Sequence, residues 1–262
     1  MKLIWAYIKI GFKNNTIYRA NYLLGLAGAF IQLFITLAIW KSLYGCDDVV
    51  NGVSFRMLTT NFVFAIGLQN AFSFNDFSVQ DKYNDGSIAM EFLKPVDYRL
   101  SILATDMGNI AFRVLTNFVP VLITSIFVVG IKAPHSIYEF LFFLISIFCG
   151  FLILWAISFI VNMTTFWIIN VWSVSVLKGI LISVFSGITL PIWFLPDNIL
   201  KIIKYTPFES IYFSPIQMYL GQLSNDEIMN MFIKQLFWFT FLASVGNIMW
   251  MRGRKRLIVQ GG

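Results

Sequence analysis

Residues 21–40, NYLLGLAGAFIQLFITLAIW, decide the class of this protein, because the whole stretch carries no charged side chain. Roughly 20 mostly apolar helical residues are enough to cross the hydrocarbon core of a bilayer. Lys2, Lys9 and Lys13 precede the stretch as they would in a signal peptide, but no convincing small-residue cleavage site follows. We therefore interpret residues 21–40 as a retained first transmembrane helix.

The composition of the whole chain supports this interpretation. Of its 262 residues, 58% are hydrophobic and 12% are charged, whereas about a quarter are charged in a typical soluble domain. We expect an all-α integral membrane protein with a single transmembrane domain over residues 1–262, because no internal repeat or soluble domain is visible. The predicted spans are residues 21–40, 57–74, 106–129, 140–162, 169–190 and 229–250.

Residues 1–19 are predicted to form an amphipathic helix at the membrane surface. Lys9 and Lys13 fall on one stripe of this helix, and Ile8 and Phe12 fall on the other side. Such a helix lies flat where lysines meet anionic head groups. The alternative is that the helix is the extended start of the first span.

Basic residues gather at both ends of the chain. Four precede the first span and four follow the last: Lys2, Lys9, Lys13 and Arg19, and Arg252, Arg254, Lys255 and Arg256. Because cytoplasmic flanks are enriched in Lys and Arg, and six spans return the chain to its starting side, both termini are predicted to be cytoplasmic. This bias explains the net charge of +6, so nucleic-acid binding is not expected.

Residues 75–105 are the longest polar interval in the first half of the chain and are predicted to be cytoplasmic. Asp85 and Gly86 favour a turn, Ser87 is placed to cap a short helix, and Pro95 ends it. A helix of about two turns is marginal in water and needs something to pack against. A partner protein is favoured over the chain's own span ends.

Residues 191–228 are predicted to lie outside. The segment holds four prolines, Pro191, Pro196, Pro207 and Pro215. Proline at this density excludes one continuous helix. The segment either dips back into the outer leaflet or forms an ordinary interfacial loop anchored by aromatic side chains.

The chain offers few side chains for catalysis. His135 is the only histidine and is predicted to lie in a loop, which excludes a zinc site with two or more histidines and disfavours a serine protease triad. The motif GxxxxGK[ST] does not occur, so ATP bound in the P-loop manner requires another subunit. Cys46 and Cys149 are far apart in sequence and predict neither a disulfide nor a metal site. We expect no catalytic residue, cofactor or metal ligand in this chain.

The predicted spans carry little charge and several uncharged amides. Asp106, Arg113 and Lys178 lie near predicted cytoplasmic ends, where a charge is cheaper than at the midplane, and this weakens the case for an ion-coupled carrier. The candidates for lining a transport pathway are Asn61, Gln69, Asn70, Asn117 and Asn170. An uncharged, aromatic pathway suits an amphipathic, lipid-like, drug-like or peptide cargo better than a bare ion.

Two stretches resemble the permeases of type-two ABC exporters. Residues 85–100, DGSIAMEFLKPVDYRL, resemble the pattern G-x-(I/L)-(A/S)-x-x-L-(L)-(K/R)-P-(V/L) between the second and third spans of that family. Residues 186–208, SGITLPIWFLPDNILKIIKYTPF, are similar to its proline-broken return segment after the fifth span. With the six spans and the amphipathic N-terminus, the resemblance covers nearly the whole chain and is closest to the short subgroup without a large extracellular domain.

The resemblance implies a half-transporter in the cytoplasmic membrane of a bacterium. Two permeases, identical or paralogous, form the pathway among membrane lipids, and two P-loop ATPase subunits bind ATP and Mg²⁺ beneath them. In the family, a coupling helix after the second span and the N-terminal helix touch the ATPase, which here implies Lys9, Lys13, Asp81, Lys82, Tyr83, Asp85, Gly86, Ile88, Phe92 and Pro95. The implied extracellular gate consists of Pro191, Trp193, Phe194, Pro196, Pro207 and Phe208.

Our first hypothesis is therefore the permease subunit of an ATP-driven exporter. An ATP-independent channel or ion-coupled secondary transporter is the alternative, and it predicts cargo flux without ATP and no P-loop ATPase encoded nearby. An intramembrane lipid-modifying enzyme is disfavoured, because catalytic side chains are scarce.

Overall fold

The structure is a computed structural model that describes residues 2–17 and 19–256. Residues 1 and 18, within the predicted amphipathic helix 1–19, and residues 257–262 lie outside the described part. That part is mostly helical, as the all-α prediction expects. Its strands are limited to a small hairpin in the loop after the first span, formed by β1 (Val49–Val50) and β2 (Val53–Ser54).

Within the described residues, four segments are long and apolar enough to cross a membrane. They are α2 (Arg19–Tyr44), α6 (Tyr98–Arg113) continued through a π-helical turn (Val114–Phe118) into α7 (Val119–Val128), α8 (Ile137–Met163) and α12 (Asn225–Gly253). A capping box at the start of α12, between Ser224 and Glu227, gives that helix a defined beginning.

The helices at the second and fifth predicted spans are shorter than expected. Helix α3 (Phe55–Ala71) has 17 residues and α9 (Trp172–Phe185) has 14, so at 1.5 Å per residue they measure about 26 and 21 Å. The hydrocarbon core is about 30 Å thick. Helix α9 ends early because Gly187 adopts a left-handed φ of 82°, and Pro191 lies only a few residues further on.

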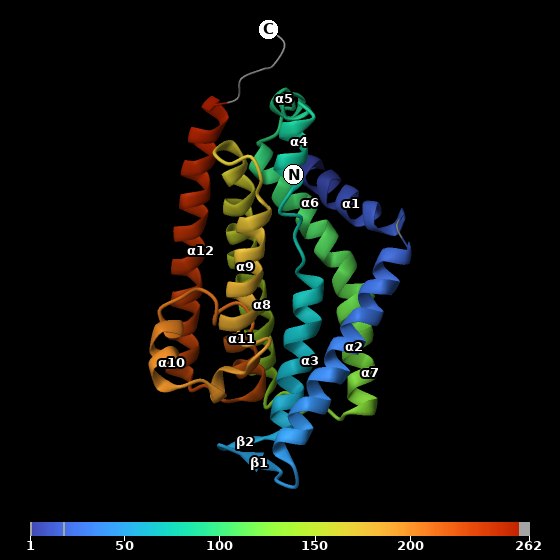
Figure 1. The fold of residues 1–262 in the computed structure, drawn as a ribbon, viewed down its shortest axis with the longest axis vertical. Coiled ribbons are helices and arrows are strands. Elements are labelled where there is room, and N and C mark those ends of the chain that lie inside the picture. The colour runs from blue at the N-terminus through green and yellow to red at the C-terminus, as the bar shows by residue number, and fades with distance from the viewer. Residues whose placement is uncertain (1, 18, 257–262) are drawn as a thin grey trace.

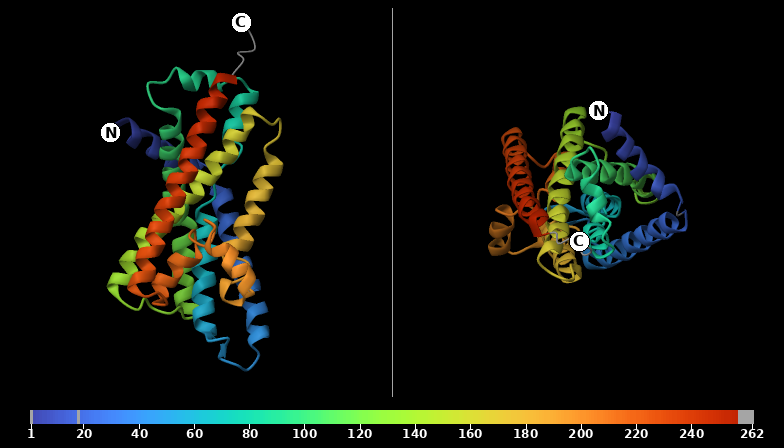
Figure 2. Two further views of the ribbon diagram at one scale, coloured as in Figure 1. Left: turned by 90° about the vertical axis from the view of Figure 1, so that its left-hand side faces the viewer. Right: turned by 90° about the horizontal axis from the view of Figure 1, so that it is seen from above.

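The long helices run between two ends of the molecule, as Figures 1 and 2 show. Helices α1 (Lys2–Ile17), α4 (Ser78–Asn84) and α5 (Ile88–Phe92) lie towards the same end as the C-terminal turns of α12. The β hairpin, α10 (Asp197–Lys204) and α11 (Phe213–Leu220) lie towards the opposite end.

Helix α1 packs across α6 and turns away from the direction of α2 (Figure 1), so it is not the extended start of the first span. The crossing depends on two glycines: a Cβ on Gly108 would lie 2.0 Å from the carbonyl oxygen of Ile8, and one on Gly11 would lie 2.1 Å from that of Thr105. Nearby, Asn15 Nδ2 donates a hydrogen bond to a side chain of α6 at 2.7 Å.

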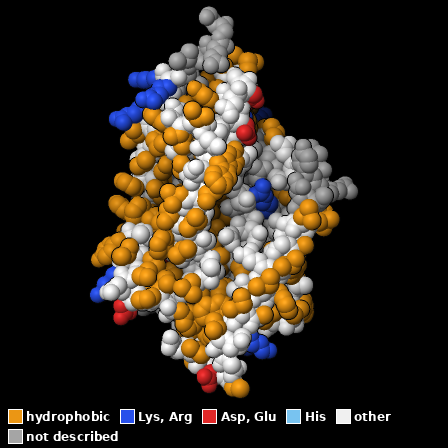
Figure 3. Space-filling model, in the orientation of Figure 1, with side chains coloured by type: hydrophobic (Ala, Val, Ile, Leu, Met, Phe, Trp, Pro, Cys, Tyr) orange, Lys and Arg blue, Asp and Glu red, His pale blue; other side chains and the backbone are white. Residues whose placement is uncertain are grey.

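The core of the bundle lies where α3, α8 and α11 meet. Every residue of α11 is buried, and α11 packs against both α8 and α3. Phe62 of α3 and Ile153 of α8 are also fully buried. Figure 3 shows hydrophobic side chains along the length of one outer face, with most of the visible charged side chains near its two ends. A bilayer covers such a surface.

Candidate functional site

The start of α4 is attached to the end of α8 by Asn162. Its Oδ1 accepts hydrogen bonds from Ser78 Oγ at 3.0 Å and from the backbone N–H of Val79 at 3.1 Å. Its Nδ2 donates to the backbone carbonyl of Asn75 at 3.1 Å. Since Val79 is fully buried, this end of α4 has a fixed position relative to α8.

A buried ion pair attaches the same segment to α9. Lys178 Nζ donates hydrogen bonds to Asp76 Oδ1 at 2.6 Å and to Ser158 Oγ at 3.0 Å, and Ser175 Oγ donates to Asp76 Oδ2 at 2.6 Å. Asp76 is only 5% exposed. The sequence indicated Lys178 as an isolated charge in an apolar span, but Asp76 gave no sign of belonging with a lysine 102 residues away.

Gln80 joins α4 to the loop before α9. Its Nε2 donates to the carbonyl of Ile169 at 2.9 Å, and its Oε1 accepts from the N–H of Val171 at 3.2 Å. In the same loop Asn170 accepts a hydrogen bond from the N–H of Trp172 at 2.9 Å. Asn170, predicted to line the pathway, is thus an exposed residue at the beginning of α9.

The short helix α5 packs on its own chain, which corrects part of the predicted docking surface. Ile88 is 3% exposed, and the ring of Phe92 stacks on Trp250 of α12 with centroids 5.3 Å apart. Ile88 therefore belongs to the core, whereas Phe92 packs on the end of a span but is still 39% exposed. The other two apolar side chains of this turn, Met90 and Leu93, point outward and are 64% and 77% exposed.

Charged side chains hold the turn around α5 in shape. Glu91 accepts hydrogen bonds from Lys82 at 2.9 Å and from Lys94 at 2.8 Å. Burial raises the pKa of Glu91, but the bonds from Lys94 and Lys82 outweigh it and leave the pKa lowered. Ser87 makes no side-chain cap, contrary to expectation. Instead Asp85 Oδ1 accepts from the N–H of Ser87 at 2.8 Å, and hydrogen bonding to Ser87 lowers the pKa of Asp85.

The remaining predicted docking residues lie on or close to this end of the molecule. Gly86 has the left-handed φ of 76° that the predicted turn requires. The side chains of Lys9 and Lys13 are exposed on α1. The exposed predicted residues around α4 and α5 are Asp81, Tyr83, Asp85, Gly86 and Pro95, with Lys82 partly exposed.

The predicted gate residues belong to a broken segment that packs on several helices. Pro191 is buried and precedes a 3₁₀ turn (Ile192–Phe194). In this turn Phe194 lies 4.8 Å from Trp40 of α2, and Trp193 lies 5.1 Å from Phe213 of α11 (ring centroids). Pro196 is exposed before α10, Pro207 is buried, and Phe208 stacks on Phe185 at 6.0 Å.

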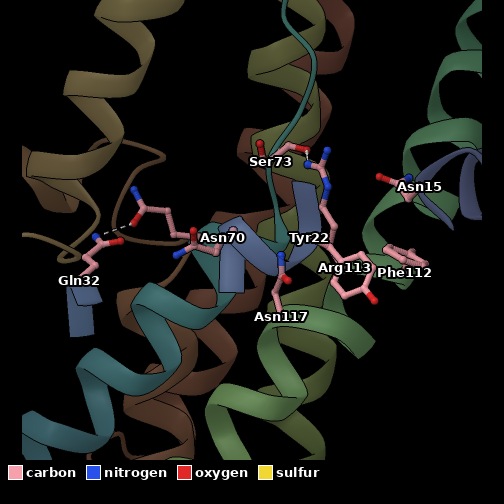
Figure 4. Close-up of a pocket in the computed structure, with 10 residues that line it drawn as sticks. Asn15, Tyr22, Gln32, Asn70, Ser73, Phe112, Arg113 and Asn117 are labelled. Carbon is pink, nitrogen blue, oxygen red and sulfur yellow. Dashed lines mark hydrogen bonds between the residues drawn. The ribbon is translucent and has the colours of Figure 1, made fainter. Parts of the chain in front are cut away.

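A pocket of about 460 Å³ lies among α1, α2, α3, α6 and the π turn. The pocket is lined by three of the residues predicted to line a pathway, Gln69, Asn70 and Asn117. Figure 4 shows the amides of Asn70 and Asn117 in the pocket. Asn61 does not line it: its side chain is fully buried, and its amide has no hydrogen-bond partner among the described residues. The lining residues that the sequence did not indicate as such are Asn15, Tyr22, Gly25, Gln32, Ser73, Phe112 and Arg113.

Other kinds of site find no support in the part of the chain that the structure describes. No three His, Cys, Asp or Glu side chains of residues 2–17 and 19–256 are grouped to hold a metal ion. Cys46 and Cys149 are both free. His135 Nδ1 lies 3.1 Å from Glu139 Oε2, and their side chains are 68% and 19% exposed.

The sequence was compared with models of known protein families. A family model described as "ABC-2 family transporter protein" matches residues 30–261, from within α2 to beyond the end of α12. No curated protein matches the sequence.

Proposed function

This chain belongs to the ABC-2 transporter family, and we propose that it is the membrane permease subunit of an ATP-driven exporter. Its energy comes from ATP and Mg²⁺ bound by two separate P-loop ATPase subunits, and its cargo moves outward. A second permease, identical or paralogous, completes the pathway. The cargo is amphipathic, lipid-like, drug-like or a peptide.

Six spans complete the proposed topology, with both termini in the cytoplasm of a bacterium. Helices α3 and α9 serve as the second and fifth spans, and the non-helical segments that follow them cover the remaining depth of the bilayer. Non-helical backbone is tolerated there only where protein covers it, and Ser186, Gly187 and Ile188 directly after α9 are buried. The segment 191–228 then lies on the outer side and closes the pathway.

The observation that supports this function best is the way α4 is held. Its inner side is attached to α8 through Asn162, to α9 through Asp76 and Lys178, and to the loop between them through Gln80. Its outer neighbours around α5 are exposed. A push from a closing ATPase pair would therefore move α8 and α9 with α4, which is what a coupling helix does.

We place the centre of the ATPase contact at Met90 and Leu93, with Asp85 and Gly86 beside them. Large exposed apolar side chains at the cytoplasmic end of a permease are covered when a partner binds. Phe92 is a poor residue for testing this contact, since it packs on Trp250 and an aspartate there would disturb the permease itself.

Leu93→Asp is expected to reduce co-purification of the P-loop ATPase encoded beside the permease by at least tenfold. The reason is that a charge replaces a 77% exposed leucine at the centre of the proposed interface, where desolvating it is costly. The amount of permease in the membrane should not change. Val49→Asp is the matched control, because Val49 is exposed at the opposite end of the molecule.

Equal co-purification of the ATPase with Leu93→Asp, Met90→Asp and the control would contradict the docking surface. Cargo flux through liposomes that contain only the permease would instead support the ATP-independent channel or carrier.

A further inference from the structure

The pocket beside the π turn has a local cause in the sequence. Pro120 has no N–H, and in a regular helix its ring would clash with the carbonyl of Thr116. The helix widens here, and the N–H of Val119 bonds to the carbonyl of Val114, five residues back. Single π turns occur often at functional sites. This one places Arg113 and Asn117, which are four residues apart, on the same side of the helix and in the wall of the pocket.

Arg113 gives the pocket a positive charge. Figure 4 shows its guanidinium pointing to Ser73, whose backbone carbonyl accepts a hydrogen bond from Nη1. Among residues 2–17 and 19–256, no carboxylate lies within 4.0 Å of this guanidinium, and the pocket lining contains no Asp or Glu. Asp106, the nearest acid along α6, is two turns away. A guanidinium has five N–H donors, so Arg113 has donors to spare for an anion.

The rest of the pocket offers neutral hydrogen-bonding groups. Asn117 is 6% exposed, and its Oδ1 has no partner among the described residues. A buried amide oxygen without a partner is costly unless a ligand or water supplies one. The amides of Gln32 and Gln69 face each other at 3.5 Å, a long contact that a polar ligand can replace. These groups suit the hydroxyl and ester groups of a polar head.

Exposed apolar side chains alternate with the pocket residues along the same helices. On α2, Leu24 precedes the pocket residue Gly25, and Ile31 precedes the pocket residue Gln32. Leu24 is 71% exposed and Ile31 is 61% exposed. In the π turn, Leu115 lies between Arg113 and Asn117 and is 58% exposed. A ligand whose head fills the pocket therefore has apolar surface next to it for a hydrocarbon tail.

We propose that this pocket binds the anionic head of an amphiphilic cargo, with Arg113 as the counter-charge, the amides on the head group and the tail along α2. The proposal rests on the proposed function, because it names the cargo class of the same permease. The pocket volume of about 460 Å³ is in the range of small-molecule sites. A bare anion would make no use of the apolar surface, and a cation would be repelled by Arg113.

The test uses the full-length permease, purified in a neutral detergent without the ATPase. Binding of three amphiphiles with one tail is measured by native mass spectrometry: dodecyl phosphate, dodecyl glucoside and dodecyltrimethylammonium. We expect dodecyl phosphate to bind at least tenfold tighter than the other two. Inorganic phosphate alone, added as competitor, should not displace it at comparable concentration.

Two pairs of variants assign the binding to this pocket. Arg113→Gln should abolish the preference for the phosphate head, and Arg113→Lys should keep most of it. A Cβ on Gly25 would meet Asn117 Nδ2 at 3.6 Å, an ordinary contact, so Gly25→Leu projects into the pocket and should reduce dodecyl phosphate binding at least tenfold. Gly179→Leu, on α9 and outside the pocket lining, also has nothing within 4 Å of the added Cβ and should bind like the unchanged protein.

Equal affinity for the three heads, an unchanged preference in Arg113→Gln, or equal effects of Gly25→Leu and Gly179→Leu would overturn the proposal. Displacement by inorganic phosphate as effective as by dodecyl phosphate would overturn the role of the tail. The binding assay contains no ATPase, so its result does not depend on ATPase docking. If dodecyl phosphate binding fails while the ATPase still co-purifies with the permease, the cargo site alone is refuted. Binding as expected, without any co-purifying ATPase, refutes the proposed function alone.

Discussion

Lys178→Met is expected to destabilise the permease by about 3–5 kcal/mol, the usual cost of removing one partner of a buried ion pair. The carboxylate of Asp76 is 5% exposed and would keep only the hydrogen bond from Ser175 at 2.6 Å. The measurement is the free energy of unfolding of the purified permease in denaturant. Lys201→Met, at an exposed position of α10, should change stability by no more than about 0.5 kcal/mol.

The double variant Asp76→Asn with Lys178→Met separates stability from coupling. Replacing both charges removes the uncompensated carboxylate, so most of the lost stability should return. If the pair transmits motion from α4 to α9, the double variant will still hydrolyse ATP with its partner but transport less cargo per ATP. If Lys178→Met is as stable as the double variant, Asp76 and Lys178 do not form a buried ion pair in which each charge depends on the other.

The sequence predicts the helical membrane fold well because long apolar runs leave few alternatives. Residues 21–40, 140–162 and 229–250 all lie within long helices, α2, α8 and α12. Within the predicted spans 57–74 and 169–190, the helices α3 and α9 end at Ala71 and Phe185, although hydropathy continues through Phe72 and Ile188. Apolar composition predicts burial in lipid or protein, but it does not predict where a helix ends.

The candidate site was harder to predict, because it depends on which face of each element meets another. The sequence predicted a short helix that needs something to pack against, but only tertiary packing shows that Ile88 lies inside and Leu93 lies outside. Two of the amides predicted to line a pathway, Asn61 and Asn170, do not line this pocket. Pro120 within an apolar span was the available signal for the π turn and hence for Arg113 as a pocket residue.

Gly108→Ala is expected to displace α1 from α6. The new Cβ would lie 2.0 Å from the carbonyl oxygen of Ile8 and 2.8 Å from the N–H nitrogen of Phe12, and backbone atoms of α1 cannot rotate away as a side chain can. Overpacking costs about 1–3 kcal/mol even where side chains give way, so we expect at least that loss. Hydrogen exchange of α1 amides should rise, and an engineered cysteine pair across the crossing should no longer form a disulfide.

Gly179→Ala is the matched control for this crossing, because the same substitution in α9 meets nothing within 4 Å. An alanine in place of an exposed helical glycine stabilises by about 1 kcal/mol, so the two variants should shift stability in opposite directions. Since α1 also carries Lys9 and Lys13, its displacement should weaken ATPase co-purification in Gly108→Ala and leave it unchanged in Gly179→Ala. Protected α1 amides in Gly108→Ala would show that α1 does not depend on the close approach of Gly11 and Gly108.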